Sequence, residues 1–163
     1  MRRLIDVLLS IFFLLILLPI IIFTAIIIKF DSKGPIFFIS NRVGKNNKNF
    51  KMIKFRTMYK NTEIIETSKL QNPNLKITKI GKVLRKYSID ELPQFFNILN
   101  GDMSIVGPRP HMVEHDIHYS NLFSNFLKRH KCNPGLTGWA QVNGLRGATP
   151  HPDIMKRRME FDL

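Results

Sequence analysis

The chain has 163 residues, which suits one domain and at most a small appendage. Its 25 lysines and arginines outnumber 12 acidic residues and give a formal charge of +13. This charge favours an anionic partner: nucleic acid, an anionic membrane surface or a phosphorylated substrate. Cys132 is the only cysteine, which excludes an internal disulfide and fits a reducing compartment.

The N-terminal segment is strongly apolar. Residues 7–28 carry no charge, and a straight helix of these 22 residues would be about 33 Å long, close to the thickness of the hydrocarbon core of a membrane. A cleaved signal peptide is disfavoured, because the run is too long and no small-residue cleavage site follows it. Asp6 precedes the run and is expected at the level of the lipid headgroups, where it could pair with Arg2 or Arg3.

Two features of this run bear on its topology. Pro19 lies inside it and should kink or break a helix there. Arg2 and Arg3 precede the run and Lys29 and Lys33 follow it, so the positive-inside rule places both ends on the cytoplasmic side. We therefore predict a re-entrant helix that bends at Pro19; a helix that spans the membrane is the alternative.

A glycine–proline turn signal divides the chain into a membrane anchor, residues 1–33, and a second part, residues 34–163. In the second part, residues 36–39 and 50–55 are β-prone runs on either side of a polar turn. This pattern predicts a small β-hairpin.

Most of the remaining chain is predicted to be helical. Hydrophobic patterns and helix-breaking residues predict helices over residues 61–70, 80–87, 88–99, 113–131 and 154–163. The helix from residue 88 is expected to begin with a capping box from Ser88 to Glu91 and to end at Gly101. The buried side of the helix over 113–131 is expected to carry Ile117, Leu122, Phe123, Phe126 and Leu127. The predicted fold class is α/β: a helix-dominated, irregular single domain with a small β-hairpin and the N-terminal re-entrant helix.

Asp90 and Glu91 are adjacent acids at a predicted helix start. Free backbone N–H groups and the helix dipole should lower the pKa of Asp90 and keep it ionised, as a nucleophile requires. Glu91 could bind a divalent cation that screens the repulsion between a carboxylate and a substrate phosphate. A purely structural interpretation is the alternative, since acids are common in first helical turns, where they cap the helix and favour its dipole.

Arg109 lies between two prolines, which should hold its guanidinium in a rigid loop suited to clamping phosphate. A structural turn with an exposed arginine is the alternative. Arg85, Lys54 and Arg56 could add positive charge near the same phosphates, although a single basic residue is weak evidence in so basic a chain.

A second pattern competes with this interpretation. His111, Glu114 and His115 match the H-x-x-E-H pattern of inverted zinc peptidases, and on a helix the two histidines would share a face. His111 directly follows a proline, however, and a third ligand would be needed, for which Glu160 is the only late glutamate. A membrane-anchored zinc peptidase is therefore one alternative function. A non-enzymatic basic protein that binds membrane surfaces or nucleic acid is another.

Four sequence blocks occur in order: KFRTM at 54–58, SIDELPQ at 88–94, NILNGDMSIVGPRP at 97–110 and PGLTGWAQVNG at 134–144. In these blocks the chain resembles the monotopic polyprenol-phosphate phosphoglycosyl transferases, the bacterial sugar transferase family. The resemblance extends from the apolar segment to the last residue. Four ordered blocks are far more specific than any single motif here.

The resemblance implies a two-step transfer of a sugar-1-phosphate from a UDP-sugar to polyprenol phosphate. Asp90 matches the family's nucleophile, which attacks the β-phosphorus, releases UMP and forms a phosphosugar–aspartyl intermediate. Glu91 matches the family's acid that is associated with Mg²⁺, Arg109 its phosphate-contacting arginine and Arg85 a basic residue near the site. Lys54 and Arg56 would add phosphate contacts.

The resemblance also implies a nucleotide-sugar region that includes Gln141 and Asn143. The pattern of residues 143–147 and 155–163 looks more like the branch that transfers hexose-1-phosphates, such as glucose or galactose. The expected partners are a UDP-sugar, polyprenol (undecaprenyl) phosphate and membrane lipids, with a homodimer possible and no nucleic acid. The expected location is the bacterial inner membrane, with a catalytic domain on its cytoplasmic face.

Two departures from the family pattern stand out. The family's helix looks broken at a Ser-Pro pair, whereas this chain has Leu18-Pro19. The family core usually continues past the position of Leu163, so the catalytic domain is expected to be shortened at its C-terminus.

Overall fold

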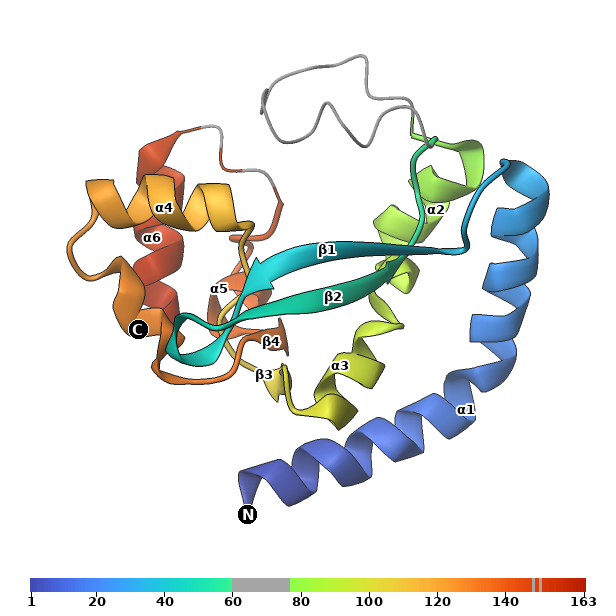
Figure 1. Cartoon of the computed structure of the whole chain (residues 1–163), viewed down its shortest axis with the longest axis horizontal. Helices are drawn as coiled ribbons and strands as arrows, with labels where there is room; N and C mark the ends of the chain where they lie inside the picture. Colours follow the sequence, from blue (N-terminus) through green and yellow to red (C-terminus); the bar gives the residue numbers. More distant parts are fainter. Residues whose placement is uncertain (60–76, 148, 150) are drawn as a thin grey trace.

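The structure, a computed structural model, describes residues 1–59, 77–147, 149 and 151–163 (Figure 1). Its elements in chain order are α1 (Arg2–Asp31), β1 (Phe37–Val43), η1 (Lys45–Asn47), β2 (Asn49–Phe55), α2 (Lys79–Tyr87), η3 (Ile89–Glu91), α3 (Gln94–Asn100), β3 (Ser104–Val106), α4 (Val113–Leu122), η4 (Phe126–Lys131), β4 (Gly135–Thr137), α5 (Trp139–Val142) and α6 (Pro152–Asp162). The α/β class, with dominant helices and one small antiparallel hairpin, is confirmed. The helix predicted over residues 61–70 lies outside the described residues.

The long helix α1 is apolar and bent. Within the part of the chain that the structure describes, it is the one helix whose length and composition would allow it to cross a membrane. Figure 1 shows its two halves running in different directions, and Pro19 inside the helix accounts for a bend because it removes a backbone hydrogen bond. Ile21 and Ile28 pack with Phe55 and Leu84 in one core cluster. Most other large side chains of α1 are exposed and leave an apolar surface.

The N-terminal end of α1 is tied to the rest of the fold. Asp6 is buried and accepts hydrogen bonds from the Ser104 hydroxyl at 2.7 Å and from the Ile105 backbone N–H at 3.0 Å. Arg2 and Arg3 donate to backbone carbonyls in β3 and at the end of α3. The expected pairing of Asp6 with Arg2 or Arg3 was therefore wrong, because donors of β3 give its carboxylate buried partners; its place at the level of the lipid headgroups stays a prediction.

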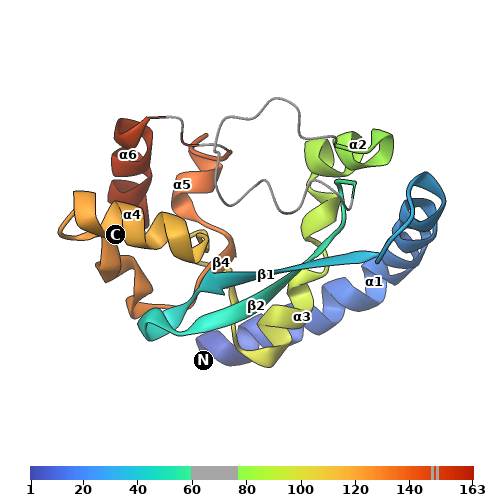
Figure 2. The ribbon, with the colours of Figure 1, turned by 45° about the horizontal axis from the view of Figure 1, so that its top comes forward.

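The predicted hairpin is confirmed as β1 and β2, which pair antiparallel with Phe37 opposite Phe55. The turn between them contains Asn46 and Asn47 with positive φ angles of 55° and 59°, a conformation that asparagine tolerates better than most residues. Figures 1 and 2 show the hairpin running between α2 at one end and α4 at the other. Lys54 lies near the end of β2, opposite Phe38 of β1.

The segment around the two acids differs from the predicted capped helix. Ser88 has a φ of 60° and ends α2, and its side chain makes no capping hydrogen bond to the turn that follows. A single 3₁₀ turn, η3, then precedes α3, which begins at Gln94 directly after Pro93. The capping-box prediction was wrong because Pro93 comes too late for the first turn of one continuous helix. Gly101 ends α3 with a φ of 90°, as predicted.

Strands β3 and β4 form a parallel pair, with Ser104 opposite Gly135, that the sequence did not predict. The strands lie close because Gly107 has no side chain: a Cβ there would lie 2.4 Å from the Asn133 carbonyl oxygen. This contact fixes the path of the chain as it leaves β3 for Arg109.

The predicted helix over residues 113–131 is two elements, α4 and η4. The chain becomes extended at Phe123 and then forms tighter turns, so the expected helical face does not continue. Phe126 is fully buried with Tyr119, Met155 and Met159, and Phe123 packs against that cluster. Burial was predicted wrongly for Ile117, Leu122 and Leu127, which are exposed. The helix predicted over 154–163 is confirmed as α6.

Candidate functional site

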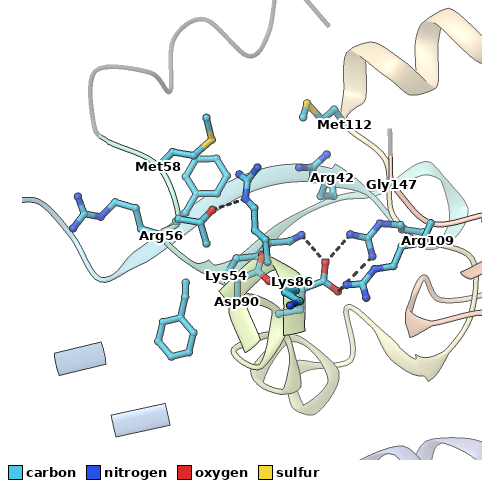
Figure 3. A pocket seen from close by; sticks show the side chains of 15 residues that line it. Arg42, Lys54, Arg56, Met58, Lys86, Asp90, Arg109, Met112 and Gly147 are labelled. Atoms are coloured by element: carbon cyan, nitrogen blue, oxygen red, sulfur yellow. Dashed lines mark hydrogen bonds and ion pairs between the residues drawn. The ribbon is translucent and has the colours of Figure 1, made fainter. Parts of the chain in front are cut away.

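A groove of about 680 Å³ opens between the hairpin, α2, η3 and the loop around Arg109 (Figure 3). The cationic side chains that line it are Arg42, Lys54, Arg56, Arg85, Lys86, Arg109 and Arg146. Among the described residues of the lining, the acids are Asp90 and Glu91. A groove of this size and charge suits a ligand of nucleotide size that carries phosphates.

Asp90 lies in the single turn η3 and is 8% exposed. Burial raises the pKa of its carboxyl; Lys54 opposes this shift and the neighbouring charge of Glu91 adds to it. The expectation of a lowered pKa was therefore wrong, because one short turn offers a weak dipole and burial outweighs it. Arg85 and Arg109 also favour the ionised form of Asp90.

Glu91 is the centre of an ion-pair network. Its Oε1 lies 3.1 Å from Lys54 Nζ and 2.6 Å from Arg109 Nη2, and its Oε2 lies 3.4 Å from Arg146 Nη2. Burial of Glu91 disfavours its charged form, but the hydrogen bond and charge of Arg109, together with Lys54, outweigh burial and lower the pKa of Glu91 to about 2. Glu91 is thus ionised at neutral pH and gathers cations beside Asp90 (Figure 3).

The loop that carries Arg109 is held by hydrogen bonds to its backbone carbonyls. The Pro108 carbonyl accepts a hydrogen bond from the Gly135 N–H at 2.8 Å. The Arg109 carbonyl accepts one from the buried guanidinium of Arg129 at 2.8 Å, and Arg129 also pairs with Asp162 at 2.8 Å. These bonds hold the loop while the Arg109 guanidinium donates to Glu91, and its role as a phosphate clamp stays a prediction.

The three other predicted cations line the groove in different ways. Lys54 faces Glu91, and burial lowers the pKa of Lys54 although Glu91 opposes that shift. Arg85 donates from Nε to the Thr57 hydroxyl at 2.8 Å, which holds it over the groove. Arg56 donates to the backbone carbonyls of residues 32 and 33, and its guanidinium points away from Asp90 in Figure 3. A phosphate contact by Arg56 stays a prediction.

A second, more apolar groove of about 480 Å³ adjoins the first at Glu91 and Arg146. Phe13 and Leu17 of α1 line it, together with apolar residues of α3, β4 and α5. Gln141 lines this second groove and donates to the Leu136 carbonyl at 3.3 Å.

The nucleotide-sugar role predicted for Gln141 and Asn143 stays a prediction. Asn143 is exposed and donates to the Trp139 carbonyl at 2.9 Å. Neither residue lines the basic groove.

The zinc pattern does not form a site. His111 precedes α4, stacks on Phe126 at 5.9 Å and lies 2.7 Å from the guanidinium of Arg129. Burial lowers the pKa of His111 well below its ordinary value, and Arg129 adds to the shift. His115 packs edge-on against Tyr119. The described residues include no group of three ligands that could hold a metal ion, so the zinc peptidase is not supported.

Asp90 and Glu91 do present a donor set that suits Mg²⁺. This ion prefers oxygen ligands and is commonly held by one or two carboxylates plus substrate phosphates. In the structure Glu91 pairs with Lys54 and Arg109, and a role for Mg²⁺ stays a prediction.

Arg146 is the main site residue that was not predicted from its charge. It follows a loop with Gly144 at a φ of 81° and precedes Gly147 at 104°. The two glycines near this basic residue could have indicated that it belongs to the site, because glycines allow the sharp turn that brings Arg146 back to Glu91.

The model of a family described as bacterial sugar transferase matches residues 1–163. A UDP-glucose:undecaprenyl-phosphate glucose-1-phosphate transferase of Xanthomonas campestris pv. campestris is 45% identical over 97% of this chain and 33% of the relative. A protein of the same name from Escherichia coli K12 is 43% identical over 100% of this chain and 35% of the relative.

The exopolysaccharide production protein PSS of Rhizobium leguminosarum bv. phaseoli is similar over more of its own length. It is 40% identical over 100% of this chain and 84% of the relative. The chain therefore spans about a third of the two glucose-1-phosphate transferases and most of the Rhizobium protein.

Proposed function

Because the chain belongs to the bacterial sugar transferase family, as its four sequence blocks predicted, we propose that it transfers a sugar-1-phosphate from a UDP-sugar to polyprenol phosphate. We favour a hexose-1-phosphate, and a place at the first membrane step of exopolysaccharide, capsule, O-antigen or glycoconjugate synthesis. The observation that carries the proposal is the meeting of two unlike grooves beside Asp90. One is basic and of nucleotide size, and the other is apolar and reaches α1.

In the first step, an oxygen of the Asp90 carboxylate attacks the β-phosphorus of the UDP-sugar. The bond from that phosphorus to the bridging oxygen breaks, and UMP leaves with the oxygen and its electron pair. In the second step, a phosphate oxygen of the polyprenol phosphate attacks the same phosphorus. The acyl-phosphate bond to Asp90 then breaks and regenerates the carboxylate.

The surrounding cations serve both steps. Lys54, Arg85 and Arg109 lie where they can neutralise the charge that develops on the phosphoryl oxygens. Glu91 orients Lys54 and Arg109 before the substrate arrives, which lowers the cost of assembling the site. Because these cations neutralise the charge of the diphosphate, the anionic carboxylate of Asp90 can also approach it.

Mg²⁺ would be held by Glu91 together with the substrate diphosphate. When bound, the ion would screen the charge of the phosphates and help UMP to leave. A chelator should then stop UMP release, and added Mg²⁺ should restore it. Full activity in excess chelator would contradict this part of the proposal.

The apolar groove is proposed to receive the lipid acceptor from the membrane. The exposed apolar surface of α1 would lie in one leaflet, and the polyprenol would pass along Phe13 and Leu17 to bring its phosphate to Arg146. The basic groove would face the cytoplasm.

The re-entrant topology of α1 is part of the proposal. Support comes from the bonds of Arg2, Arg3 and Asp6 to β3 and α3, since a helix tied at both ends to one domain has both ends on one side. Single cysteines at positions 2 and 33 in a Cys132→Ser chain test it. Both sites should be protected from an impermeant reagent in intact cells, and labelling of position 2 from outside would show that α1 spans the membrane.

The function is tested by incubating the purified protein with a panel of UDP-sugars and polyprenol phosphate. We expect UMP release and a polyprenol diphosphosugar with at least one UDP-hexose. Asp90→Asn should abolish both products while the protein stays folded. Asp153→Asn, which alters an exposed acid of α6, is the matched control and should keep them. Near-normal turnover by folded Asp90→Asn would refute the assignment.

A further inference from the structure

A small chamber of about 160 Å³ adjoins the basic groove, and Lys54 and Arg109 line both. Gln94, His115 and Arg158 line the chamber and do not line the groove itself. Its volume is below the roughly 300–1,000 Å³ of pockets that take whole drug-sized ligands. The chamber is therefore suited to one ring or group of a larger ligand whose remainder lies in the groove.

Gln94 presents an unpartnered donor there. The residue is 2% exposed, and its side-chain Nε2 has no hydrogen-bond partner among the described residues. A buried amide that lacks a partner is costly in free energy, so native structures rarely contain one without a reason. Gln94 is the first residue of α3, three positions after Glu91, so the short link through Pro93 fixes its place relative to the reactive acids.

Arg158 brings a second such donor from another part of the chain. It lies on α6, is 3% exposed and donates from Nη2 to the Gly147 carbonyl at 3.0 Å. Its Nε has no partner within the described part of the chain. Burial lowers the pKa of Arg158, Arg109 and Arg129 add to this shift, and Asp162 opposes it.

Polar and apolar groups both line the chamber around these two donors. No carboxylate belongs to its described lining, whereas Thr149 and His115 can accept as well as donate hydrogen bonds. Met52 and Met155 supply apolar surface. Donors, mixed donor–acceptors and a small apolar wall together match a polyhydroxylated ring, which offers several hydroxyl oxygens and a C–H face.

We propose that this chamber is the subsite for the hexose ring of the UDP-sugar, and that Gln94 and Arg158 donate hydrogen bonds to its hydroxyl oxygens. The inference rests on the proposed function, because it assigns one end of that substrate. The diphosphate then lies at Lys54 and Arg109, between the chamber and the wider part of the groove. The uridine occupies that wider part, where Phe38 and Phe55 line the wall.

The test measures binding by calorimetry, and every protein in this comparison carries Asp90→Asn, so that the covalent adduct cannot form and turnover does not contribute. The dissociation constants of UDP and of UDP-glucose or UDP-galactose are compared for Asp90→Asn alone and for its combinations with Gln94→Met and Arg158→Gln. Methionine keeps the length of the glutamine side chain without its donor. Arg157→Gln, the exposed neighbour on α6, is the matched control.

We expect both chamber variants to bind UDP within about twofold of Asp90→Asn alone and to bind the UDP-hexose about 5- to 150-fold more weakly, the effect of leaving a buried polar group unpaired. Arg157→Gln should change neither constant. If a chamber variant weakens the binding of UDP as much as the binding of the UDP-hexose, the chamber holds the uridine and the proposal is overturned. If neither constant changes, Gln94 and Arg158 are only structural, which overturns it too.

Two further measurements keep these outcomes distinct. Thermal unfolding identifies a variant that has lost its fold. In that case Gln94→Glu replaces Gln94→Met, and Arg158→Lys replaces Arg158→Gln. Failure of the unmodified protein to release UMP from any UDP-hexose would refute the proposed function. The comparison of UDP with UDP-hexose binding would still decide the subsite.

Discussion

Replacing Glu91 by glutamine should destabilise the protein strongly and in a pH-dependent way. The side chain of Glu91 is 8% exposed and holds Lys54, Arg109 and Arg146 within 2.6–3.4 Å. The lowering of its pKa from 4.5 to about 2 corresponds to about 3–4 kcal/mol of stability, at about 1.4 kcal/mol per unit. Removing one member of a buried ion pair typically costs about 3–5 kcal/mol, which agrees in size.

The sign of the pH dependence follows from the direction of the shift. Because the pKa of Glu91 is lower in the folded state than in the unfolded state, its contribution is complete above pH 4.5. It is lost as the pH falls toward 2. The free-energy difference between the unmodified protein and Glu91→Gln should therefore be about 3–4 kcal/mol at pH 7 and less than half as large at pH 3.

Urea unfolding in detergent micelles at both pH values measures this difference. Glu160→Gln, which alters an exposed glutamate of α6, is the control and should cost less than about 0.5 kcal/mol at either pH. A cost for Glu91→Gln that is the same at pH 7 and pH 3 would refute the reasoning. So would a cost below about 1 kcal/mol at pH 7, since the network would then be too weak to order the cations.

Three further outcomes are expected. Asp6→Ala should lower the free energy of unfolding by about 3 kcal/mol, because it leaves the donors of Ser104 and Ile105 unpaired. A loss below about 1 kcal/mol would show that the bonds between α1 and β3 contribute little to stability. Arg109→Lys should slow UMP release about 10- to 100-fold, because lysine cannot keep the forked contact, and a change within twofold would contradict the clamp. The acid limb of the pH profile of kcat/KM for UMP release should have its midpoint above 3.8, because burial raises the pKa of Asp90; a lower midpoint would contradict that burial effect.

The sequence predicted the elements whose signals are local. The apolar run with Pro19, the polar turn of the hairpin and the glycine that ends α3 each rest on a few adjacent residues, and the structure contains all three. The two adjacent acids and Arg109 were also identified from local chemistry. The structure brings Arg109 within 2.6–3.4 Å of Glu91, and Asp90 lines the same groove.

The parts that were missed depend on contacts between distant segments. The pairing of β3 with β4 needs the close approach of Gly107 and Gly135, which are far apart in the sequence. The pKa of Asp90 is raised by burial, which no local pattern reveals, although a helix start argued for the opposite sign. The break between α4 and η4 likewise follows from packing of Phe126 against α6.

The covalent step is the central claim, and intact-mass spectrometry of the protein with a UDP-hexose alone tests it most directly. We expect the unmodified protein to gain the mass of one phosphohexose, to release an equal amount of UMP, and to lose the adduct when polyprenol phosphate is added. Asp153→Asn should behave in the same way, and Asp90→Asn should gain no adduct. UMP release without any adduct on the unmodified protein, or an adduct on folded Asp90→Asn, would contradict the account.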